Sequence, residues 1–205
     1  MKNDNYEETL PQGYKEVFSI NAKNFKTGLI FNLVALAPVI LLVALGIIIL
    51  DINGKTDYFL SSEFLISLFC CLVATLIYMV LHELVHGIVY KSMTRRKLTF
   101  GLSWSCAFCG VPDVYCYRRT ALLALIMPFA VFTLLFAALT AVSYFVFYYA
   151  FVPCCLLLGL HVGGCSGDLY MTALLLFRYK DKRLLVRDTG PEQFLYLPDR
   201  AVLEN

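Results

Sequence analysis

The chain has 205 residues, of which 60% are hydrophobic and 16% are charged, and its mean hydropathy is +0.71. A soluble domain of this length has no use for so much apolar surface, so the composition favours an integral membrane protein. The eight cysteines lie mostly within or beside apolar runs, and their spacing predicts no disulfide framework.

Four apolar runs are long enough to cross about 30 Å of hydrocarbon at ~20 residues each. We expect an all-α integral membrane protein with transmembrane helices at about 27–50, 63–90, 121–152 and 154–177. Only a turn around Pro153 separates the last two runs, so they should form a tight antiparallel pair. Residues 27–177 are thus expected to form one membrane core.

The basic residues predict the orientation of these helices. Of the 17 Lys and Arg residues, 16 lie in the N-terminal tail, the 91–120 loop or the C-terminal tail, and Lys55 is the exception. The positive-inside rule places both termini and that loop in the cytosol. Residues 1–26 are then a cytosolic tail, and residues 178–205 form a cytosolic hairpin or tail. The basic clusters set topology and contact anionic lipid, and they do not indicate a nucleic-acid partner.

The loop between the second and third runs contains the stretch LTFGLSWSCAFCGVPDVYCY, at about 98–117. A fifth span here would place one basic cluster outside, whereas a re-entrant or membrane-surface hairpin keeps both inside. The alternating, aromatic and turn-rich pattern favours short strands in this hairpin. Cys106 and Cys109 form a CxxC motif with Cys116 nearby, but no fourth ligand for a second metal site is evident.

The second run contains VLHELVHGIVYK, in which two histidines and a glutamate interrupt the apolar sequence. His82 and His86 are four residues apart, so a helix presents both imidazoles on one face. Glu83 lies about 100° round the helix from His82 and can still point into a site between helices. This HExxH spacing predicts a zinc site whose glutamate accepts a proton from zinc-activated water. In hydrocarbon an isolated ionisable group costs ~2.5 kcal/mol or more, so these groups need partners.

A catalytic zinc site needs a third protein ligand, and the last run offers His161 and Asp168 in the stretch HVGGCSGDLY. His82 precedes the basic flank at Lys91 by nine residues. Asp168 precedes the flank at Arg178 by ten. At 1.5 Å per residue both lie about 14 Å below the same surface. His161 is two turns deeper, so Asp168 is the predicted third ligand.

His161 shares a helix face with Asp168, together with Gly164 and Cys165. A position beside the substrate path, a hydrogen bond to a neighbour of the metal and simple packing are all compatible with this placement. The sequence leaves these three roles open.

HELVHG in the second run and GCSGDLY in the last resemble the bacterial membrane family called putative zincin peptidases, which is allied to the site-2 intramembrane metalloproteases. The resemblance extends from about Tyr14 to Tyr196. It includes Pro128 in the third run and the C-terminal stretch RDTGPEQFLY.

In site-2 proteases the two HExxH histidines and an aspartate from a later span hold the metal. This resemblance maps the ligands onto His82, His86 and Asp168, and the catalytic base onto Glu83. It also implies that a membrane-embedded β-hairpin, here residues 98–117, offers an edge to the substrate.

The resemblance thus implies a zinc-dependent intramembrane protease of the bacterial plasma membrane, with its active site toward the cytosolic side of the lipid bilayer. It would cleave peptide bonds of a membrane protein or peptide. Two other functions stay open. A zinc-binding scaffold or sensor would enclose the metal with a fourth ligand, such as Cys165 or His161. A metal-dependent hydrolase could instead act on lipids or amides. We expect no other cofactor and no nucleic-acid partner, and the sequence does not indicate the oligomeric state.

Overall fold

The computed structural model describes residues 5–103 and 106–199, and these residues form two compact units. Among the described residues, unit 1 comprises 5–30, 82–103, 106–128 and 168–199. Unit 2 comprises residues 31–81 and 129–167. The chain therefore passes from one unit to the other within helices.

The helices account for most of the chain. Three of them are long and apolar enough to cross a membrane: α1 (Phe25–Ile52), α2 (Ser62–Thr94) and α3 (Arg118–Val146). The segments that follow are the 3₁₀ turn η1 (Tyr148–Ala150), α4 (Phe151–Gly164), α5 (Ser166–Ala173) and the π-helical turn η2 (Leu174–Arg178). Tyr148–Gly164 and Ser166–Arg178 are bent by 43° at Cys165 and count as a fourth candidate span if taken together.

The turn expected around Pro153 lies earlier in the chain than predicted. The chain leaves α3 after Val146, and Pro153 lies in the first turn of α4. Proline is tolerated there because the first backbone N–H groups of a helix have no intrahelical acceptor. The proline thus marks the beginning of a helix, and the turn precedes it.

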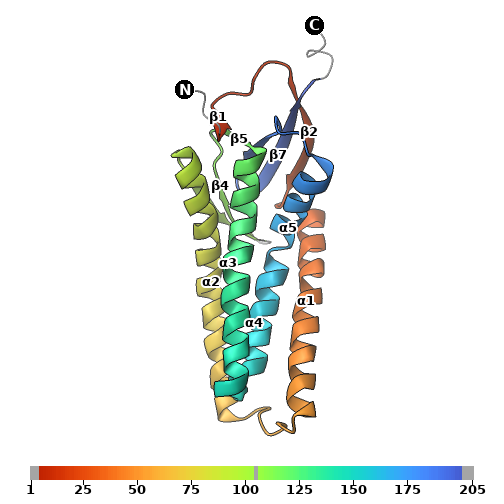
Figure 1. Ribbon diagram of the computed structural model, residues 1–205, viewed down its shortest axis with the longest axis vertical. Helices are drawn as coiled ribbons and strands as arrows, with labels where there is room; N and C mark the ends of the chain where they lie inside the picture. The colour runs from red at the N-terminus through yellow and green to blue at the C-terminus, as the bar shows by residue number, and fades with distance from the viewer. Residues whose placement is uncertain (1–4, 104–105, 200–205) are drawn as a thin grey trace. The chain divides into compact units, whose positions relative to one another are not determined.

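In unit 2, segments of α1, α2, α3 and α4 lie side by side (Figure 1). Glycines of α4 allow α1 to come close: a Cβ built at Gly159 would lie 2.8 Å from Val39 Cα, and one at Gly163 would lie 2.4 Å from the Ala35 carbonyl oxygen. Many large apolar side chains of α1 and α2 remain exposed, among them Ile40 and Phe69. Such an outward apolar surface suits contact with lipid.

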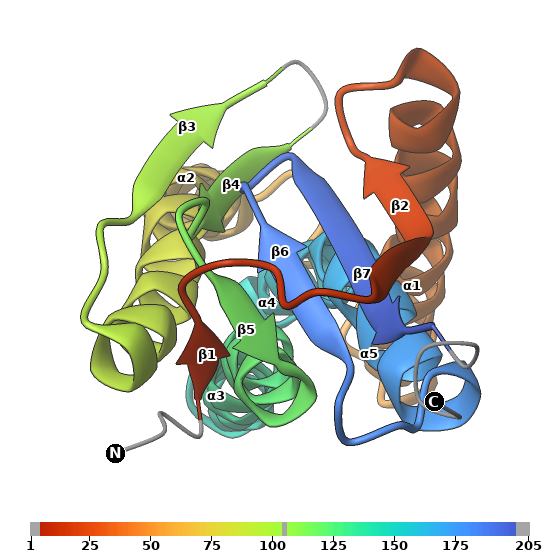
Figure 2. The same cartoon turned by 90° about the horizontal axis from the view of Figure 1, so that it is seen from above.

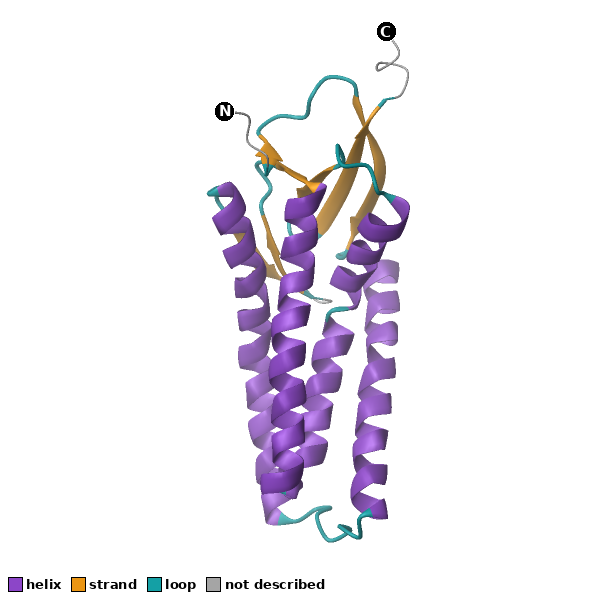
Figure 3. Cartoon of the chain, in the orientation of Figure 1, coloured by secondary structure: helices purple, strands orange, loops and turns teal. Residues whose placement is uncertain are grey.

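All strands belong to unit 1 (Figure 3). Five of them form a sheet in the order β1-β5-β6-β7-β2, seen from above in Figure 2. They are β1 (Tyr6–Glu7), β2 (Tyr14–Asn21), β5 (Tyr115–Tyr117), β6 (Leu185–Asp188) and β7 (Glu192–Pro198). All neighbouring strands are antiparallel.

The sheet corrects the expected all-α class, because both terminal tails contribute strands to it. β2 pairs with β7 along its length, so the N-terminal tail is held by the C-terminal hairpin. A core of Leu125, Leu175, Val186, Leu195 and neighbouring side chains fills the space between this sheet and the helices of unit 1. The expected division into a tail at 1–26, a membrane core at 27–177 and a C-terminal segment at 178–205 stays a prediction.

The hairpin expected at 98–117 is present in part. β3 (Thr99–Leu102) pairs with β4 (Ala107–Gly110) in a separate two-stranded sheet, while β5 joins the larger sheet. Residues 104–105 of the expected hairpin lie outside the described residues. Its re-entrant or membrane-surface position stays a prediction.

Gly163→Ala is expected to destabilise unit 2, because its new methyl group would meet the backbone of α1. Overpacking of this kind typically costs about 1–3 kcal/mol, which should lower the thermal unfolding temperature in detergent. Gly164→Ala is the matched control, since a Cβ there meets nothing within 4 Å. Equal unfolding temperatures for the two variants would contradict the proposed close approach of α1 and α4.

Candidate metal centre

Three side chains of unit 1 converge on one point. The Nε2 atoms of His82 and His86, both on α2, lie 3.2 Å apart. Oδ2 of Asp168, on α5, lies 3.2 Å from the first and 3.3 Å from the second. The two histidines are buried and the aspartate is largely buried. The structure therefore brings together the three residues that the sequence analysis selected as ligands.

Hydrogen bonding fixes which nitrogen His86 turns toward this point. Its Nδ1 lies 2.9 Å from the Ala124 carbonyl oxygen on α3, and a carbonyl can only accept, so Nδ1 carries the proton. In a neutral imidazole Nε2 is then a lone pair, and it faces a carboxylate oxygen of Asp168. Two acceptors at this distance repel each other, so a proton or a metal cation must lie between them.

The distances suit zinc. Zinc is bound tetrahedrally by His nitrogen and carboxylate oxygen at about 2.0–2.1 Å, so two ligand atoms should lie roughly 3.3 Å apart. The three separations of 3.2–3.3 Å match that edge. The carbonyl behind His86 is also the kind of partner that orients a zinc-bound histidine. The donor set thus fits a zinc ion with one position left for water or substrate.

Glu83 occupies the position in α2 directly after His82 and is partly buried. Four residues further on, Gly87 lies against the β3–β4 hairpin: a Cβ built there would be 2.8 Å from Phe100 Cζ and 3.2 Å from Leu98 Cδ1. Because Gly87 follows His86 directly, the hairpin begins beside the metal ligands. A larger residue than glycine at this position would push the hairpin away from α2.

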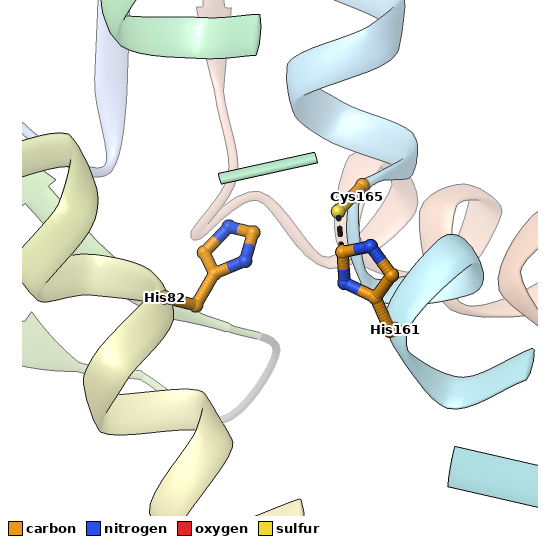
Figure 4. Close-up of side chains that lie close together, drawn as sticks. All are labelled: His82, His161 and Cys165. Atoms are coloured by element: carbon orange, nitrogen blue, oxygen red, sulfur yellow. Dashed lines mark hydrogen bonds between the residues drawn. The ribbon is translucent and has the colours of Figure 1, made fainter. Parts of the chain in front are cut away.

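His161 belongs to unit 2 and is fully buried there. Its Nδ1 lies 2.7 Å from the Tyr78 hydroxyl, and its Nε2 lies 2.9 Å from the Thr133 hydroxyl. Figure 4 shows the Cys165 sulfur facing the His161 ring, with 3.7 Å between Sγ and Nδ1. These bonds make His161 a polar link among α2, α3 and α4, a role that differs from the three left open by the sequence. Gly164 has open space around its Cα.

A regular polar stripe runs along α2. Tyr78, His82, His86 and Tyr90 follow one another at four-residue intervals and therefore share a helix face. Each has a polar partner from a later segment of the chain: the partners of Tyr78 and the histidines are described above, and the Tyr90 hydroxyl donates to Oδ2 of Asp188 at 2.7 Å. The two tyrosines and Asp188 were missed by the sequence analysis. The signal for the two tyrosines was the four-residue spacing of ring side chains in an apolar helix, whereas no local pattern indicates Asp188.

The structure does not group the three cysteines of the 98–117 segment with other possible metal ligands among the described residues. Within residues 5–103 and 106–199, no group of three possible metal ligands includes Cys106, Cys109 or Cys116. Burial raises the pKa of the Cys109 thiol and of the Cys116 thiol to about 12. Both thiols are therefore protonated near neutral pH in the absence of a metal.

Two histidines and an adjacent glutamate on α2, together with a carboxylate from α5, are the groups of a zinc hydrolase. The comparisons agree with this class: the profile of the family described as putative zincin peptidase matches residues 75–183, and the chain belongs to that family. The matched region includes His82, Glu83, His86 and Asp168. A search of curated proteins finds no match, and neither does a search of solved structures.

Zinc is expected to raise the unfolding temperature of protein stripped with a chelator, because it binds the three ligand atoms that face one another only in the folded chain. Zinc at 100 times its Kd should add roughly 2.7 kcal/mol to the free energy of unfolding. Asp168→Ala should lose this stabilisation and Glu83→Gln should keep it. Elemental analysis should find about one zinc per chain in the wild type and in Glu83→Gln. Full zinc retention by Asp168→Ala would exclude the proposed ligand set.

Asp188 predicts a separate pH dependence. Burial raises the pKa of its carboxyl to about 6, although hydrogen bonds from Tyr90 and the Gly190 N–H lower it. In the unfolded chain an aspartate has a pKa of about 3.9. The folded state therefore binds the extra proton between pH 4 and 6, and stability falls as pH rises through this window, by at most about 3 kcal/mol. The unfolding temperature of the wild type relative to Asp188→Asn should fall over that range. A constant difference would contradict the raised pKa.

Proposed function

We propose that the protein is a zinc-dependent intramembrane peptidase, similar to site-2 proteases, that cleaves membrane-associated peptide segments near the cytosolic leaflet. The observation that carries the proposal is the triangle of ligand atoms from His82, His86 and Asp168, with sides of 3.2–3.3 Å. Two of these ligands lie on α2, a helix long and apolar enough to cross a membrane. The metal would thus lie at the depth of the apolar chain segments it acts on.

The chain's own residues supply the rest of the chemistry. Bound zinc would supply a Lewis acid that polarises a scissile carbonyl and lowers the pKa of water. Glu83 accepts a proton from the attacking water and passes it to the departing amine as the peptide bond breaks. The Ala124 carbonyl holds the His86 ring in place through Nδ1, so that Nε2 stays aimed at the site.

The β3–β4 hairpin gives a place for the substrate. β3 pairs only with β4 among the described strands, so its other edge is open. Its residues Phe100 and Leu102 are exposed, as suits an apolar partner. We infer that an extended peptide adds to this edge through backbone hydrogen bonds. Since Phe100 packs on Gly87, the peptide would lie close to the ligand helix.

The distribution of charge supports a cytosolic position for the site. Lys91 and Arg178 flank the ligand-bearing segments, and both belong to the basic clusters that the positive-inside rule keeps in the cytosol. We therefore propose that the protein is integral to the plasma membrane of a bacterium and that water reaches Glu83 from the cytosolic side. The partners are the lipid bilayer and a membrane protein or peptide.

Glu83→Gln is expected to abolish cleavage while keeping zinc, because an amide cannot accept the proton. The wild type and this variant would be expressed in cells lacking the native gene, and new protein termini would be compared by mass spectrometry. Termini that depend on Glu83 should map within or beside apolar segments. Glu63→Gln is the matched control, since Glu63 lies in the first turn of the same helix, far along it from the ligands.

Changes in lipid composition without new termini would replace the proposal with a lipid or amide hydrolase. Identical termini and lipids in the wild type and Glu83→Gln, with zinc bound in both, would indicate a zinc-holding scaffold or sensor.

A further inference from the structure

We propose that Asp188 is a positioning residue for this reaction: it joins the ligand helix α2 and the β3–β4 hairpin to one turn and so sets where a bound peptide lies relative to the metal. The inference rests on the proposed function. The profile of the family matches residues 75–183 and so does not reach Asp188. The resemblance noted in the sequence includes the stretch RDTGPEQFLY but gives Asp188 no role.

The first link runs from Asp188 to α2. Tyr90 lies one turn after His86 on the same face of α2 and is 1% exposed. Its hydroxyl donates to Oδ2 of Asp188 at 2.7 Å. Asp188 is itself 2% exposed, so this bond is shielded from water and is correspondingly strong. The position of α2 next to its metal ligands is therefore tied to one carboxylate.

The same carboxylate holds the turn between β6 and β7. Its Oδ1 accepts the Gly190 N–H at 2.9 Å, and its Oδ2 also accepts the Gln193 side-chain amide at 3.1 Å. Gly190 has a φ of +101°, which few residues other than glycine adopt. The carboxylate thus stabilises a turn that the chain adopts only with a glycine at this point.

The second link runs from this turn to the hairpin. The Val111 N–H, just after β4, donates to the Asp188 carbonyl at 2.8 Å. The Thr99 hydroxyl in β3 lies 3.3 Å from the Thr189 carbonyl oxygen. The turn and β4 also touch directly, because a Cβ built at Gly110 would lie 2.2 Å from the Gly190 nitrogen. Both strands of the hairpin are therefore fixed to the residues that hold Tyr90.

A purely stabilising role does not require a carboxylate here. Burying an ionisable group is costly, and apolar side chains of similar volume would fill the space at least as favourably. A carboxylate differs from an apolar side chain because its hydrogen bonds are directional. The donors from Tyr90, Gly190 and Gln193 must all point at its two oxygens. A displacement of about 1 Å between a substrate and its catalytic groups can reduce a rate about 100-fold, so such direction matters at this position.

Two hydroxamates test the inference in the full-length protein purified in detergent and loaded with zinc. Acetohydroxamate is small and binds only the metal, whereas a leucine-rich peptidyl hydroxamate binds the metal and lies along the hairpin. Asp188→Asn places an amide donor opposite the donors of the turn or of Tyr90. Tyr90→Phe removes one hydroxyl and is the milder change. Tyr58→Phe, at a buried tyrosine of unit 2, is the matched control.

Asp188→Asn and Tyr90→Phe are each expected to weaken binding of the peptidyl hydroxamate by about tenfold or more. Their affinity for acetohydroxamate and their zinc content should not change. Tyr58→Phe should bind both compounds as the wild type does. Unchanged affinity for the peptidyl compound in Tyr90→Phe and Asp188→Asn overturns the inference, and so does an equal loss for both compounds. If Asp188→Asn does not fold, Tyr90→Phe alone decides between these results. A wild type that binds zinc but neither hydroxamate overturns the proposed function, and with it this inference.

Discussion

A polar group within an apolar helix must find a partner, and this requirement shapes the whole site. α2 carries four such groups on one face, Tyr78, His82, His86 and Tyr90. An unpaired polar side chain in hydrocarbon has a high free-energy cost, so each of the four lies against a polar group of another segment. The partners of Tyr78 and Tyr90 are amino-acid side chains, whereas the two histidines and their carboxylate face one another and are best satisfied by a shared cation. The metal site is thus the central part of a longer polar stripe.

The neighbouring pairs give that stripe a structural meaning. In unit 2, His161 joins α2 and α3 through both of its ring nitrogens. In unit 1, Asp188 joins α2 to the β6–β7 turn. Since hydrophobic contacts alone allow a helix to slide or rotate, directional bonds of this kind favour one register. Directional bonds on either side of the two histidines therefore hold α2 in place without the help of a metal.

Local patterns in the sequence predicted the local features. Long apolar runs predicted α1, α2 and α3, and the HExxH spacing predicted the two histidines on one face. The five-stranded sheet was missed because its strands come from three distant parts of the chain, and β1 has only two residues. The pair of Tyr90 and Asp188 spans 98 positions. No local pattern indicates such a contact, and only the fold brings it about.

The bend at Cys165 has a consequence for the charge of the site. Because α4 ends there and α5 begins at Ser166, Asp168 lies in the first turn of a new helix. The aligned peptide dipoles of a helix place a partial positive charge at that end, which favours a negative side chain. An unbroken helix would have put the same residue in its interior, without that field. The break in the span thus prepares an anionic ligand in surroundings that otherwise disfavour charge, before any metal arrives.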